Sequence, residues 1–94
     1  MPTHTEAEAG EIIRAHLVSE FLFRRRGIEL VDELDLIESG IVDSMGIFRL
    51  VNFLQERFDV MIEPTEIVLD NFQSLAAMRR FIAGKLAAAP ERPA

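Results

Sequence analysis

The feature that most constrains the fold is an apolar stripe of helical period between residues 44 and 58. At about 100° per residue, five side chains of this segment fall on one face: Ile47, Leu50, Val51, Leu54 and Phe58. A helix with one apolar face packs that face against a core and turns the other toward water. The stripe therefore predicts a helix from about Ser44 to Phe58 with these five side chains inside.

The same period occurs earlier, after a possible capping box in which Thr5 lies three residues before Glu8. Gly10 costs a helix roughly 1 kcal/mol relative to alanine, so this helix could also begin after it. Three arginines at residues 24–26, followed by Gly27, predict a cationic last turn and a C-terminal cap. The apolar stripe between these signals consists of Ile12, Ile13, Leu17, Val18 and Phe21.

The last third of the chain predicts two more helices. A short one is expected at residues 63–70, with Pro64 in its first turn. Ser74 can cap a last helix, whose apolar residues are Leu75, Met78, Ile82 and Leu86. No segment alternates as a strand would, and no Asn-Gly or Asp-Gly hairpin turn is present. These patterns predict an all-α four-helix bundle, with three longer helices and one short one.

Residues 27–43 form a long connection without helical period. Connections of this length in compact domains are often functional. Gly40 suggests a turn that needs a positive φ. We expect the connection to be pinned over the core by its apolar residues, which are Ile28, Leu30, Leu34, Leu36 and Ile41.

Length and charge limit the possible classes of protein. The 94 residues allow one domain, residues 1–94, with a helical core at about 5–87 and a flexible tail at 88–94. The net charge is −6, and residues 29–70 hold eleven acids against two arginines. This acidic middle argues against nucleic-acid binding; it suits partners with basic surfaces, or is simply a solvated face. Without an apolar run of membrane length or an apolar signal core, we expect a cytoplasmic protein with no membrane insertion.

The residues that usually carry catalysis are absent or isolated. The chain has no cysteine, and His4 and His16 have no ligand-like neighbours in the sequence. A GxSxG motif and a glycine-rich phosphate loop are both missing. The sequence therefore predicts neither a metal site nor an enzyme.

The stretch ESGIVDSMGIF, residues 38–48, places Asp43 and Ser44 where the central helix begins. An Asp or Ser before an apolar-periodic run is a common helix cap, so Ser44 could have that role alone. A helix N-terminus also favours an attached phosphate, because its N–H groups are unpaired and carry positive partial charge. Ser44 is therefore either a cap or a point of attachment.

An ordered series of motifs resembles the acyl/peptidyl carrier protein family. The family pattern is an acidic, leucine-containing loop, a glycine, Asp-Ser-Leu or Asp-Ser-Met opening the second helix, and a phenylalanine ending it. A short third helix and Phe-x-Ser/Thr-Leu follow. With the first helix included, the resemblance covers about residues 5–87. The matching residues are Asp35, Leu36, Gly40, Asp43, Ser44, Met45, Phe58, Phe72, Ser74 and Leu75.

The resemblance implies a four-helix bundle of the acyl-carrier-protein type that is not itself an enzyme. Ser44 would receive covalent 4′-phosphopantetheine from coenzyme A through a phosphopantetheinyl transferase, which would recognise Asp43. The product would be a phosphoprotein whose arm supplies the thiol that the chain lacks and holds an acyl or aminoacyl group as a thioester. An adenylating ligase would load this carrier, and downstream acyl-transfer enzymes would unload it. We expect the carrier to be a monomer.

The type of carrier is harder to assign. Fatty-acid carriers typically place acids along the second helix, whereas this chain has Gly46, Arg49, Asn52 and Gln55 there. The Asp-Ser-Met-Gly sequence is instead similar to D-alanyl carrier proteins and to small stand-alone aminoacyl carriers. The cargo could be an amino acid or a specialised acyl group.

A surface beside Ser44 is predicted to bind partners: Met45, Phe48, Arg49 and Asn52 lie off the apolar stripe. Phe48 could instead tuck under the long connection and belong to the core. The chain could also be an unmodified helical interaction module that uses Met45 and Phe48, with Ser44 acting only as a cap.

Overall fold

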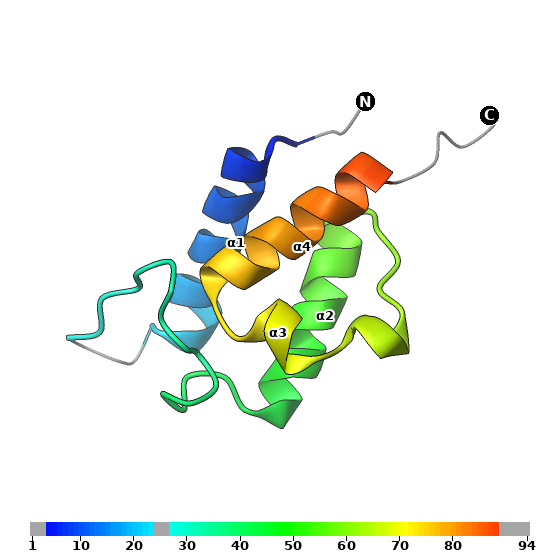
Figure 1. Ribbon diagram of the computed structural model, residues 1–94. Coiled ribbons are helices and arrows are strands. Elements are labelled where there is room, and N and C mark those ends of the chain that lie inside the picture. The colour runs from blue at the N-terminus through cyan, green and yellow to red at the C-terminus, as the bar shows by residue number, and fades with distance from the viewer. Residues whose placement is uncertain (1–3, 24–26, 89–94) are drawn as a thin grey trace.

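The computed structural model describes residues 4–23 and 27–88 and is all-helical over that part of the chain. It contains α1 (Glu6–Phe21), α2 (Ser44–Phe58), α3 (Leu69–Phe72) and α4 (Leu75–Ala88), with a 3-10 turn at Pro64–Glu66. Helix α4 contacts each of the other three helices, and the long connection runs around one end of the bundle from α1 to α2 (Figure 1). The predicted all-α four-helix bundle is confirmed. None of the helices in the described part is long and apolar enough to cross a membrane.

Helix α1 begins at Glu6 because both hydrogen bonds of the capping box are present. The Glu8 N–H donates to Thr5 Oγ1 at 3.1 Å, and the Thr5 N–H donates to Glu8 Oε1 at 2.8 Å. A start after Gly10 is therefore wrong. Gly10 is buried against α4, where an added Cβ would lie 2.8 Å from Cδ of Arg79, so the glycine leaves room for the Arg79 side chain.

The apolar face of α1 is narrower than predicted. Ile13 and Leu17 are fully buried and Phe21 is half-buried, but Val18 is exposed and does not widen the stripe. The helix ends at Phe21 without a basic residue in its last turn, so the predicted arginine cap is wrong. Residues 24–26 themselves lie outside the described residues. Gly27 has a positive φ of 78° but is not the C-cap of the helix, which is Leu22.

Helix α2 has the predicted bounds. Its core face buries Leu50, Val51, Leu54 and Phe58. Ile47 is only half-buried, which corrects the prediction: it shares this face but lies in the first turn, where the core covers it in part.

The predicted short helix at residues 63–70 is two separate turns. Pro64 occupies the first position of the 3-10 turn, as expected, but the α-helical turn begins only at Leu69. Val68 between them is extended, with φ −126° and ψ 157°. Two β-branched residues, Ile67 and Val68, separate the turns, and such residues fit a helix less well than an extended backbone.

Helix α4 begins as predicted. The Ala77 N–H donates to Ser74 Oγ at 3.0 Å, which satisfies one of the first N–H groups of the helix. All four predicted core residues are buried: Leu75, Met78, Ile82 and Leu86. Residues 89–94 of the expected tail lie outside the described residues.

The long connection packs on the bundle through apolar side chains and backbone hydrogen bonds. Leu30, Leu36 and Ile41 are buried and Leu34 is half-buried, whereas Ile28 is exposed, against expectation. The Leu36 N–H donates to the carbonyl of Gln73 at 2.7 Å, and the Val42 N–H donates to the carbonyl of Leu36 at 2.9 Å. The first bond ties the connection to the segment between α3 and α4, and the second folds the connection back on itself just before α2. The turn at Gly40 has the expected positive φ of 79°.

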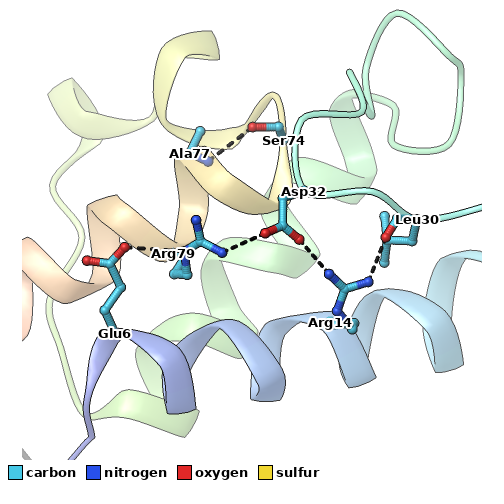
Figure 2. A network of polar contacts seen from close by, with 7 residues as sticks. All are labelled: Glu6, Arg14, Leu30, Asp32, Ser74, Ala77 and Arg79. Carbon is cyan, nitrogen blue, oxygen red and sulfur yellow. Dashed lines mark hydrogen bonds and ion pairs between the residues drawn. The ribbon is translucent and has the colours of Figure 1, made fainter.

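A polar network fixes the first half of the connection to two helices. Figure 2 shows the Asp32 carboxylate between Arg14 of α1 and Arg79 of α4. Arg79 also pairs with Glu6 at 3.2 Å, and the Ala76 N–H donates to the Asp32 carbonyl at 2.9 Å. The network therefore joins α1, the connection and the start of α4.

Candidate functional site

Asp43 and Ser44 have different roles at the start of α2. Asp43 is the N-cap: its backbone is extended, and its Oδ1 accepts a hydrogen bond from the Gly46 N–H at 2.8 Å. Ser44 is the first helical residue and is exposed, and no residue that the structure describes hydrogen-bonds to its hydroxyl. The interpretation of Ser44 as the cap is therefore wrong, and its hydroxyl is available to a second molecule.

The electrostatics of this helix end favour an anion. The first N–H groups of a helix lack intrahelical partners and carry positive partial charge. The first turn of α2 itself contains no acidic residue, although the Asp43 carboxylate at the N-cap already offsets part of that charge. A phosphate attached to Ser44 would lie where the backbone stabilises it.

Gly46 sets the packing beneath Ser44. An added Cβ would lie 2.9 Å from Cε1 of Phe21, 3.2 Å from Cγ1 of Val42 and 3.3 Å from Oδ1 of Asp43. The ring of Phe21 therefore packs directly on the first turn of α2, next to the capping carboxylate. In the sequence, Gly46 was noted only because fatty-acid carriers typically have acids along this helix. A glycine inside a helical pattern often allows close packing by another side chain, as Phe21 does here.

The predicted partner surface is accessible. Met45 is 70% exposed and Phe48 is 58% exposed, so the alternative in which Phe48 tucks under the connection is wrong. Asn52 is also exposed, and the spacing of these three residues places them along one side of α2. We call Met45, Phe48 and Asn52 the exposed strip; its use by a partner remains a prediction.

Arg49 is turned toward α1 rather than along the exposed strip. Its guanidinium carbon lies 4.8 Å from the centroid of the Phe21 ring, within the range of a cation–π contact. It borders a shallow groove between α1 and α2, lined by His16, Glu20, Arg49, Asn52, Phe53 and Glu56.

His16 forms part of the wall of this groove. Its ring stacks on Phe53, with centroids 3.6 Å apart and planes 9° from parallel. Burial lowers the pKa of His16 and Arg49 lowers it further, while Glu20 acts in the opposite direction. Packing thus disfavours the protonated form of the imidazole. In the described part of the chain, no three histidine or acidic side chains lie where they could hold a metal ion.

Comparison with known proteins finds relatives for this chain. No family model matches it. It is 35% identical over 69 residues to the D-alanyl carrier protein of Streptococcus sanguinis, a match that covers 73% of this chain and 78% of the relative. The D-alanyl carrier proteins of Streptococcus gordonii and Streptococcus thermophilus are each 33% identical over the same lengths.

Proposed function

Because the chain belongs to the acyl/peptidyl carrier protein family, we propose that Ser44 is the residue to which 4′-phosphopantetheine becomes attached. The observation that carries this proposal is the position of Ser44: it is exposed at the start of α2, while Asp43 provides the cap. A hydroxyl that the fold does not use can be esterified without the loss of a structural hydrogen bond.

The surroundings of Ser44 fit such a group. Attachment forms a bond between Oγ and the transferred phosphorus of coenzyme A and breaks the pyrophosphate P–O bond. Adenosine 3′,5′-bisphosphate leaves with the bridging oxygen, and the hydroxyl proton passes to the transferase. The new phosphodiester stays anionic and lies against the positive end of α2. The attached group supplies a thiol, which the chain lacks because it contains no cysteine.

The cargo that we propose is an aminoacyl group, held as a thioester after activation by an adenylating ligase and passed on to downstream acyl-transfer enzymes. Support comes from the relatives, which are named D-alanyl carrier proteins. The exposed strip beside Ser44 would bind the transferase and the ligase in turn, and Arg49 would contribute at its border. We propose that this exchange takes place in the cytoplasm, where coenzyme A and ATP are available.

The experiment incubates the chain with coenzyme A and a phosphopantetheinyl transferase of broad specificity, followed by intact-mass measurement. We expect one phosphopantetheinyl adduct on the wild type and none on Ser44→Ala. Ser39→Ala is the matched control, since Ser39 is an exposed serine of the preceding connection and its removal should leave the adduct in place.

A second candidate function is an unmodified interaction module, which the exposure of Met45 and Phe48 also favours. The same experiment separates the two. A folded wild type that gains no adduct supports the module and contradicts the carrier proposal for Ser44.

A further inference from the structure

Three methionines of the described chain have very different surroundings. Met45 follows Ser44 in the first turn of α2 and is 70% exposed. Met61 lies beyond the C-terminal end of α2 and is 66% exposed. Met78 lies in α4 and is fully buried. Met45 and Met61 are thus exposed to a similar extent, but only Met45 adjoins Ser44.

The composition of the chain makes the methionine sulfurs the preferred targets of oxidants. The sequence contains no cysteine and no tryptophan, so the thioethers are the most readily oxidised groups of the unmodified chain. Methionine oxidation converts a flexible apolar side chain into a polar, chiral one. Exposure then decides which of the methionines reacts first.

We propose that Met45 is an oxidative modification site whose sulfoxide slows the attachment of a group to Ser44; this inference rests on the proposed function. In the step, the Met45 sulfur attacks one oxygen of a peroxide and the O–O bond breaks. The sulfur gains that oxygen and loses two electrons, and hydrogen peroxide is reduced to water.

The structure places the consequence at binding rather than at folding. The Met45 side chain lies largely in water, so a polar oxygen there disturbs no core contact. A partner that acts on Ser44 must cover the adjacent residue and bury the sulfoxide. Burying an unpaired polar group is unfavourable by an amount that corresponds to about three- to tenfold in affinity or rate.

The test treats the unmodified chain with hydrogen peroxide, removes the peroxide, and then adds coenzyme A and the transferase. Peptide mapping follows oxidation at each methionine. We expect Met45 and Met61 to oxidise at similar rates and Met78 to lag behind both. The kcat/KM for adduct formation should fall about three- to tenfold, and methionine sulfoxide reductase should restore it.

Two matched variants assign the effect. Oxidised Met61→Leu retains Met45 and should be slowed like the wild type, with its melting temperature unchanged. Oxidised Met45→Leu should form the adduct at the same rate as Met45→Leu that has not been oxidised. The inference is overturned if oxidised Met61→Leu reacts at its full rate, if oxidised Met45→Leu is slowed, or if melting falls together with the rate. An adduct on the unoxidised wild type keeps the proposed function intact in each of these cases, whereas its absence overturns both.

Discussion

At the scale of single residues, Asp43 and Ser44 share one turn but use it differently. The carboxylate of Asp43 is directed along the backbone to the Gly46 N–H, and the hydroxyl of Ser44 is left to solvent. This arrangement makes the two side chains separable by mutation. Loss of the first should weaken the helix start, whereas loss of the second removes no hydrogen bond within the part of the chain that the structure describes.

Asp43→Ala should lower the free energy of unfolding by about 0.5–2 kcal/mol, because the Gly46 N–H loses its capping partner. It should also slow modification of Ser44 while the fold persists. Chemical denaturation and adduct kinetics on the same sample check both effects. Asp43→Asn is the control, since asparagine caps equally well: slow modification of this stable variant would indicate that the transferase needs the charge. If Asp43→Ala is modified at the wild-type rate, the role of Asp43 is structural only.

Phe48→Ala should weaken loading by the cognate ligase far more than it weakens folding. More than half of the Phe48 side chain is exposed, so truncation removes little core contact, whereas interface anchors often contribute 2 kcal/mol or more to binding. Loading kinetics and thermal melts on one preparation measure the two effects. Val18→Ala, a truncation of another exposed apolar side chain on α1, should change neither. A large melting shift with unchanged loading would remove Phe48 from the docking surface.

At the scale of elements, α2 could be predicted from the sequence because its signals are local. Asp43 caps one end, and the apolar period that follows it matches one helical face up to Phe58. The left-handed conformation of Asp59 just beyond that end (φ 54°) is known only from the structure. Periodicity identifies a face but not what covers it, which explains the errors at Val18 and Ile47. The split at residues 63–72 was missed because Ile67 and Val68 are apolar and continue the pattern, whereas the backbone of Ile67 is non-helical and that of Val68 is extended.

Leu54→Ala tests the assigned core face of α2. Leu54 is fully buried, so truncation should cost about 2–5 kcal/mol in the free energy of unfolding. For a domain of this size that is a large part of the total stability. Ile47→Ala is the control on the same face: because Ile47 is half-buried, its loss should be clearly smaller. A near-neutral Leu54→Ala in urea or thermal unfolding would mean that the face is wrongly assigned.

At the scale of the whole molecule, the contacts that could not be read from the sequence join distant segments. Ser44 and Asp43 could be predicted as site residues because they belong to a series of motifs that follow one another in a fixed order along the sequence. The Phe21 ring on Gly46 and the pairing of Asp32 with Arg14 and Arg79 were not, because no local pattern specifies which helix lies across from which loop. These contacts place the connection, and thus the start of α2, relative to α1 and α4.

The Asp32 network predicts how the fold responds to acid. The hydrogen bond from Arg79 is the largest effect and lowers the pKa of Asp32 below its ordinary value. Burial acts in the opposite direction, and the charges of Arg79 and Arg14 lower the pKa further. A lowered pKa in the folded state means that the unfolded chain binds a proton more readily. The stabilisation is therefore complete above the unfolded pKa of about 3.9 and is lost as the pH falls through the folded value.

Asp32→Asn should therefore remove part of the dependence of the free energy of unfolding on pH. Its free energy of unfolding should be lower than that of the wild type near neutral pH, and the difference should shrink as the pH falls below about 4. Urea unfolding of both proteins across pH 2–7 measures the two curves. Asp70→Asn alters an exposed carboxylate of α3 that has no ion pair with any residue that the structure describes, so its curve should parallel that of the wild type. If the Asp32→Asn and wild-type curves also run parallel, the carboxylate does not couple the connection to the two helices. The apolar contacts of Leu30 and Leu36 and the backbone hydrogen bonds then hold the connection in place.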